Sequence, residues 1–227
     1  MPGMTKELQT LFYAGRQFMD NAAADPEASA LLSARGIDAA KLQGGETLYG
    51  SAIAAVADNG TAFATQIQAT DDFNLAFDAS WEETQDLARI LASAYEGQSE
   101  ELVLLGLHQR RDSSTGASEI AWPQSKALPA YLPWARNFYA RLAEGAFVEM
   151  AAAFGYPAEE IAAMSGRVEE VGNLDNAQER AKAHTRQSTE DRDREAAAFK
   201  AWFGRQKIVA RVALKNKKRL LELLGLR

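Results

Sequence analysis

The chain has 227 residues, a net charge of −6 and an apolar fraction of 47%, which is ordinary for a globular protein of one large or two average domains. It contains no cysteine, so disulfides and thiolate metal sites are excluded. No apolar run approaches the roughly 20 residues of a membrane span, and the first residues lack the apolar stretch of a secretory signal. We therefore expect a cytoplasmic protein.

The residue composition favours helix along nearly the whole chain, because Ala, Leu, Glu, Gln and Arg dominate it. A first helix is predicted over residues 5–23. Asp25 followed by Pro26 predicts the N-cap and first position of a short second helix, which ends at Gly36.

A much longer helical stretch is predicted over residues 38–96 and again over 157–215. In the first of these, a seam of mostly apolar residues recurs at helical spacing and includes Phe63. Each stretch is either one helix on the order of 85 Å long or a hairpin, with a turn at 58–61 or 68–72. The continuous helix is favoured because the two stretches have equal lengths. Gly97 and Asn216 are predicted to end them in the left-handed conformation.

Residues 109–133 read as a linker, since they contain Pro123, Pro129 and Pro133. Its aromatic residues Trp122 and Tyr131, with Trp134 just beyond it, predict that the linker packs onto the helices.

The second half of the chain repeats the first. Residues 36–107 align with 155–226 at a constant offset of 119 without a gap, and both end in Leu-Leu-Gly-Leu. Upstream, residues 12–14 match residues 138–140, both Phe-Tyr-Ala, if seven extra residues are placed in the first copy. The repeat predicts an all-α protein of two tandem related helical units, 1–108 and 134–227, forming an elongated antiparallel bundle of coiled-coil type.

Charge differs sharply between equivalent parts of the repeat. Residues 200–227 carry nine basic side chains and one acidic, whereas residues 81–107 carry six acidic side chains and one basic. We expect these segments to attract each other within the protein or between subunits. The alternative is that Lys215, Lys217, Lys218 and Arg219 bind nucleic acid or an acidic lipid surface.

One polar motif is shared by the two copies: Gln68, Thr70 and Asp72 recur as Gln187, Thr189 and Asp191. These residues form either a paired polar site where the copies meet, or helix caps or a polar layer that fixes the register of the helices. The second interpretation is favoured.

Residues suited to catalysis are scarce. The two histidines, His108 and His184, are not part of a Glu-x-x-His pair, and the chain has no phosphate-binding loop and no Gly-x-Ser-x-Gly motif. His184 is predicted to lie at a helix interface. We expect no metal and no cofactor.

The pattern of the second copy resembles a loosely defined set of uncharacterised bacterial all-helical proteins. The features that carry this resemblance are Phe138-Tyr139, Phe154-Gly155-Tyr156, Gln187-x-Thr189, Trp202 and the segments 208–214 and 220–226. No function is established for such proteins, so the resemblance implies no site.

The sequence leaves three hypotheses about function. The first is a non-enzymatic structural or interaction protein that forms a homodimer or binds another protein. The second is binding of an anionic polymer or surface through the basic C-terminal segment. The third is a small-ligand pocket between helices, lined by Trp81, Trp202 and Phe203.

Overall fold

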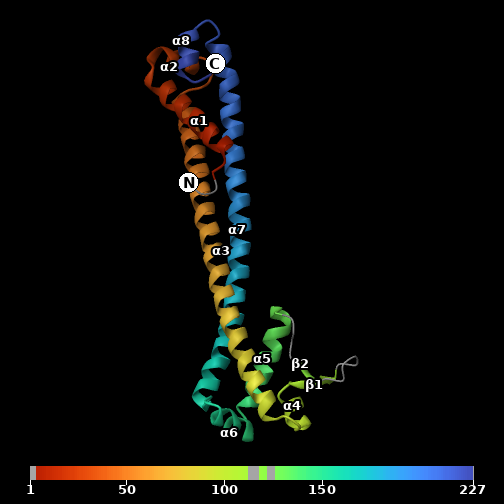
Figure 1. The fold of residues 1–227 in the computed structure, drawn as a ribbon. Coiled ribbons are helices and arrows are strands. Elements are labelled where there is room, and N and C mark those ends of the chain that lie inside the picture. Colours follow the sequence, from red (N-terminus) through yellow and green to blue (C-terminus); the bar gives the residue numbers. More distant parts are fainter. Residues whose placement is uncertain (1–3, 112–117, 122–125, 227) are drawn as a thin grey trace. The chain divides into compact units, whose positions relative to one another are not determined.

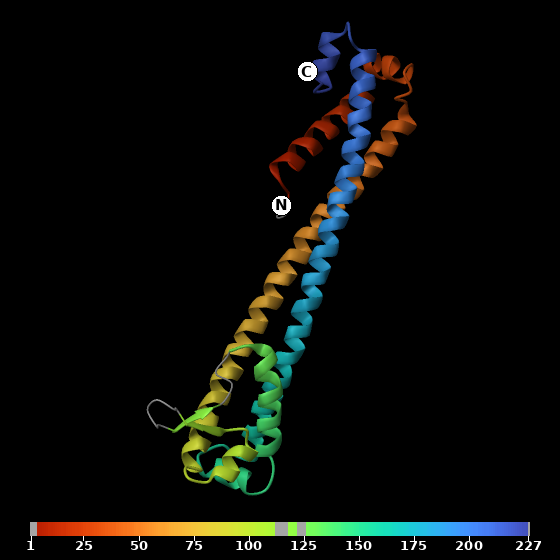
Figure 2. The same cartoon turned by 90° about the vertical axis from the view of Figure 1, so that its right-hand side faces the viewer.

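A computed structural model describes residues 4–111, 118–121 and 126–226. The chain is an all-α bundle whose two longest helices, α3 (Ala39–Ala94) and α7 (Ala158–Ala213), lie side by side (Figures 1 and 2). Both are continuous for 56 residues, so the long-helix alternative is confirmed and the turns considered at 58–61 and 68–72 are absent. Among the described residues, no helix is both long and apolar enough to cross a bilayer.

The order of the helices repeats. The first set is α1 (Lys6–Ala24), α2 (Pro26–Ser33), α3 and α4 (Ser99–Leu104), and the second is α5 (Leu128–Leu142), α6 (Ala146–Ala153), α7 and α8 (Lys218–Leu223). Two short antiparallel strands that the sequence did not predict, β1 (His108–Arg111) and β2 (Ser118–Ala121), follow α4 in the region read as linker. Of the predicted anchors, Tyr131 and Trp134 lie on α5, and Trp122 lies outside the described residues.

The helix ends follow the local sequence signals. Asp25 accepts a hydrogen bond from the backbone N–H of Ala28, which confirms the predicted cap of α2. Gly97 has φ of +84°, as predicted, but no described residue other than glycine has positive φ, so the expectation for Asn216 was wrong. The repeated Leu-Gly-Leu ending also has a physical cause. Gly106 and Gly225 are left-handed, and the leucine after each donates its N–H to a carbonyl five residues earlier.

The first helices of the two sets correspond differently from the sequence match. Tyr13 is 74% exposed, whereas its predicted counterpart Tyr139 is 2% exposed. The buried faces agree when α5 is compared with α1 at an offset of 120, which pairs Phe18 with Phe138 and Met19 with Tyr139. The match between residues 12–14 and 138–140 was therefore wrong. The pattern of buried residues along the whole helix defines the correspondence better than three identical residues do.

The chain divides into two compact units, each drawing on both halves of the sequence. Unit 1 comprises Met1–Gln66 and Ala181–Arg227, and unit 2 comprises Ile67–Arg180. In unit 1 the core joins α1 and α2 to the adjoining parts of α3, α7 and α8. In unit 2 it joins α5 and α6 to the other parts of α3 and α7 and to α4. In both units α3 and α7 run antiparallel, as pairs such as Ala62–Thr185 and Glu83–Arg167 show.

The two cores place their bulk on different helices. Unit 1 is filled by Phe199 and Phe203 on α7, which stack on each other 6.2 Å apart. The equivalent positions in unit 2 are Ser80 and Thr84 on α3, and there Tyr131, Phe138 and Tyr139 of α5 supply fully buried rings beside those of α3. The predicted seam of α3 is also corrected at one turn, because Phe63 is 51% exposed and Ala62 is buried in its place.

Candidate functional site

A buried polar layer joins α3 to α7 in unit 1. The Asn59 side chain, only 5% exposed, donates from Nδ2 to Ser188 Oγ at 3.2 Å and to Thr189 Oγ1 at 2.9 Å. Its Oδ1 accepts from Arg192 Nη1 at 3.1 Å. One turn away, Thr185 donates to the carbonyl of Ala62 at 3.1 Å. Because a buried amide is costly without partners, this layer fixes which turn of α7 faces Asn59.

The repeated polar motif is used mostly within single helices. Gln68 donates to Asp72 at 2.7 Å and Gln187 donates to Asp191 at 3.2 Å, and both are exposed pairs four residues apart. The first pair lies in unit 2 and the second in unit 1. Thr70 is partly buried on α3. Of the six residues, Thr189 joins the polar layer around Asn59.

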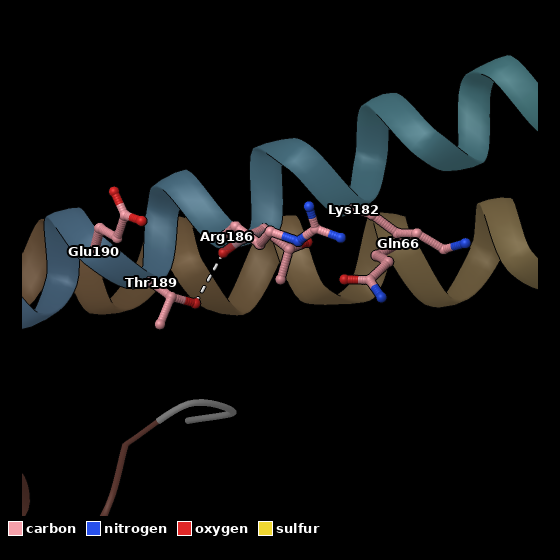
Figure 3. Close-up of a pocket in the computed structure, with 6 residues that line it drawn as sticks. Gln66, Lys182, Arg186, Thr189 and Glu190 are labelled. Carbon is pink, nitrogen blue, oxygen red and sulfur yellow. Dashed lines mark hydrogen bonds between the residues drawn. The ribbon is translucent and has the colours of Figure 1, made fainter.

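The surface beside this layer is hollowed, with a volume of about 460 Å³ (Figure 3). Figure 3 shows Lys182, Arg186, Thr189 and Glu190 on α7 and Gln66 on α3, with Thr189 donating to the Thr185 carbonyl at 2.8 Å. The rim mixes basic and acidic groups, so it does not select one sign of charge. His184 is exposed and lines a second hollow of about 320 Å³ together with Asp58 and Thr61 of α3, so it lies at the edge of the α3–α7 interface and is not buried in it.

Part of the basic C-terminal segment is tied to α2. Lys217 Nζ lies 2.7 Å from a Glu27 oxygen, and Arg219 lies 3.3 Å from Glu27 and 3.5 Å from Asp25. The hydrogen bond from Lys217 lowers the pKa of Glu27, and the backbone N–H of Ala28, aided by the charge of Arg219, lowers the pKa of Asp25. Sequence reasoning overlooked these acidic partners, since they lie outside the acidic segment 81–107.

Some of the remaining charge of this segment lies near exposed apolar side chains. On α7, Ile208 is 67% exposed and Val212 is 57% exposed, and Arg205 is exposed on the same face. Lys215, two residues beyond the end of α7, is exposed as well. Lys218 is also exposed. Because Ile208 and Val212 are one turn apart and like-signed charges lie near them, this face is a candidate surface for a partner.

The acidic segment has a matching surface on α4 in unit 2. Val103 is 61% exposed and Leu104 is 52% exposed, and Glu100 is exposed on the same side of the helix. Glu96, at the end of α3, is exposed as well. The C-terminal parts of the two repeat copies therefore both combine exposed apolar residues with charged ones, and the charges have opposite signs.

A cluster of hydroxyl groups is buried in unit 2. Tyr131 bonds Ser80 at 2.7 Å and Thr84 at 2.9 Å, and Thr84 also bonds Tyr139 at 3.0 Å. Burial raises the pKa of Tyr139 and of Tyr131. Gln85, the next residue along α3, has a buried Nε2 without a hydrogen-bond partner. The cluster stabilises neutral tyrosines and offers no general base near neutral pH.

The aromatic residues proposed for a ligand pocket are not one group. Trp81 packs against the core of unit 2, whereas Trp202 and Phe203 belong to the core of unit 1. In the part of the chain that the structure describes, no cluster of three or more His, Asp and Glu side chains could hold a metal ion. No family model, curated protein or solved structure matches the chain, so the site can be judged only from its own residues.

Proposed function

We propose that this chain is a structural protein that acts by self-association, with the basic segment 200–227 of one copy contacting the acidic segment 81–107 of another. The observation that carries the proposal is the pairing of opposite charge with exposed apolar side chains on these two segments. Exposed apolar surface supplies the free energy of association, and opposite charge supplies its orientation.

Contacts within the chain involve only some of the basic side chains of this segment, and the others can contact a second copy. Lys217 and Arg219 bond to α2 in their own unit, while Lys215 and Lys218 are exposed. The basic segment lies in unit 1 and the acidic segment in unit 2, so each compact unit carries one of the two surfaces. A contact of Ile208 and Val212 with Val103 and Leu104 would remove four exposed apolar side chains from water.

The mass of the full chain in solution tests this proposal, measured by light scattering during size exclusion at about 50 mM and about 500 mM NaCl. We expect a dimer at low salt and a shift toward monomer at high salt. The double variant K215E/K218E should be monomeric, as should E96K/E100K. A mixture of the two variants should associate again, because the charges are then exchanged and not lost.

The matched control is K6E/K41E, which changes the same number of exposed charges on α1 and α3 of unit 1. It should associate like the unmodified chain. A chain that is monomeric at low salt up to high concentration contradicts the proposal, and so does equal dissociation in the control and in K215E/K218E.

Binding to an anionic surface is a second candidate, favoured by Arg205 on α7 and Lys215 just beyond it, which flank the exposed Ile208 and Val212. It predicts salt-sensitive binding of the full chain to vesicles that contain phosphatidylserine, lost in K215E/K218E. Absence of binding to such vesicles at low salt rejects this candidate and leaves self-association untouched.

A further inference from the structure

Unit 2 contains a hollow of about 470 Å³ between α5, α6 and α7. Its walls are mainly small or apolar, with Ala140, Val148, Ile161 and Ala162 among them, and the buried ring of Tyr139 contributes to it. Arg136, Ser165 and Glu169 supply its polar groups. An apolar hollow of this size with a few convergent polar groups is typical of small-molecule sites.

The arginine at this hollow has a counterpart in unit 1. At the offset of 120 that relates α1 to α5, Arg136 corresponds to Arg16. Arg16 holds two carboxylates at once, Asp20 at 2.7 Å and Glu46 at 2.7 Å. Arg136 instead forms a two-pronged pair with Glu169, from Nε at 2.8 Å and Nη2 at 2.7 Å. Unit 1 therefore shows that an arginine in this position accommodates two carboxylates.

Three of the residues that line the hollow have shorter side chains than their counterparts in unit 1. Asp20, Gln43 and Glu46 of unit 1 are replaced by Ala140, Ala162 and Ser165. All three replacements line the hollow. Two of them, at Asp20 and Glu46, remove a carboxylate, while Glu169 adds one where unit 1 has Gly50. The net loss from the protein at this place is thus one anionic group.

The Arg136 guanidinium retains donors for a second anion. Its fork to Glu169 uses one hydrogen on Nε and one on Nη2. A guanidinium has five N–H donors, so three remain, two of them on Nη1. Arg136 on α5 and Glu169 on α7 both line the hollow, and the arginine side chain is 47% exposed, so an incoming carboxylate can reach it.

We propose that this hollow binds a small apolar carboxylic acid, with the ligand carboxylate on Arg136 and Ser165 and its apolar body against Val148, Ile161 and Ala162. The carboxylate occupies the place that Asp20 and Glu46 fill in unit 1. The apolar body fills the volume left by the shorter side chains. This site is separate from the surfaces proposed for self-association.

Decanoate is a suitable probe, and decanol is its uncharged match of equal chain length. Binding of each to the full chain is measured by titration calorimetry below the concentration at which the probe forms micelles. We expect decanoate to bind at least about tenfold more tightly than decanol, because only the acid gains the charged hydrogen bonds to Arg136. Equal affinities, or no binding of decanoate, overturn the proposal.

Two variants locate the site and one serves as a control. S165E restores the carboxylate that unit 1 has at this position, so it should pair with Arg136 and weaken decanoate binding about tenfold or more. A162Q restores the longer side chain of unit 1 and should weaken both probes. R141Q, on the same helix as Arg136 and outside the hollow, should bind decanoate normally.

Both site variants are helix-compatible replacements at positions that are exposed or half-exposed, so their folding can be checked by circular dichroism at equal concentration. If S165E and A162Q fold and bind decanoate like the unmodified chain, the proposal is wrong.

Discussion

At position 15 on α1, Phe199, a residue distant in the sequence, leaves no room for a side chain larger than that of glycine. A Cβ built on Gly15 would lie 2.7 Å from Cε1 of Phe199 and closer still to Cζ. Carbon atoms in contact prefer about 3.5–4.0 Å, so the ring would have to move by about 1 Å. Phe199 is fully buried and packs against other aromatic rings, Trp202 and Tyr49 among them, so its movement disturbs the whole cluster.

The substitution Gly15→Ala should therefore destabilise the chain. Overpacking of a core costs about 1–3 kcal/mol, while replacing glycine by alanine inside a helix returns up to about 1 kcal/mol. We expect a net loss of about 1–2 kcal/mol. Urea unfolding followed by far-ultraviolet circular dichroism measures it. The matched control is Gly44→Ala on α3, where no atom lies within 4 Å of the new Cβ, and it should gain about 0.5–1 kcal/mol.

A double-mutant cycle with Phe199→Leu tests the cause. Leucine removes the ring atoms that the new methyl meets, so Gly15→Ala should cost less in that background, with a coupling of about 1 kcal/mol. If Gly15→Ala stabilises the chain as much as Gly44→Ala does, or costs the same with leucine at 199, the packing argument is refuted.

Three further predictions concern polar groups. Asn59→Ala should cost about 1–3 kcal/mol in urea unfolding, because it leaves the buried Ser188 and the partly buried Arg192 with fewer hydrogen bonds. Tyr139→Phe should cost about 1 kcal/mol at neutral pH. Since burial raises the pKa of Tyr139 in the folded chain, its contribution is present below pH about 10 and is lost as the pH rises further, so the cost should shrink in alkali. The pKa of Glu27 is lowered by Lys217, so its contribution is present above pH about 4.5 and lost as the pH falls, and Glu27→Gln should show a weaker loss of thermal stability in acid.

Each of these three predictions has a result that would contradict it. An Asn59→Ala chain as stable as the unmodified one means that the polar layer does not fix the pairing of the helices. A cost of Tyr139→Phe that stays constant above pH about 10 means that the hydroxyl titrates normally. Identical acid profiles with and without Glu27 mean that its pair with Lys217 contributes nothing, as for many exposed ion pairs.

Features that depend on neighbouring residues could be predicted from the sequence. Asp25 and Pro26 define the start of α2 because a cap is made within one turn of the chain. Gly36 and Gly155 both end short helices with positive φ, as their equal places in the repeat require. The equal lengths of α3 and α7 likewise follow from the repeat without a gap.

Features that depend on two distant segments could not be predicted in the same way. The partners of Asn59 on α7 depend on the register between two helices, which no local pattern gives. The exposed position of Phe63 and the buried position of Ala62 differ by one residue, which periodicity alone does not resolve. Glu27 as the partner of Lys217 was missed for the same reason, since charge counts do not show which surfaces meet.

By itself, the sequence determined that this protein is helical, where four of its helices start and stop, and that its second half repeats its first. Those properties are local, because hydrogen bonds within a turn and the period of apolar residues set them. Only the tertiary structure decided which turns pair, that Gly15 must make room for Phe199, and that Arg136 borders a hollow where Arg16 meets two carboxylates. These properties arise from packing, because whether a side chain fits depends on residues that are distant in the sequence.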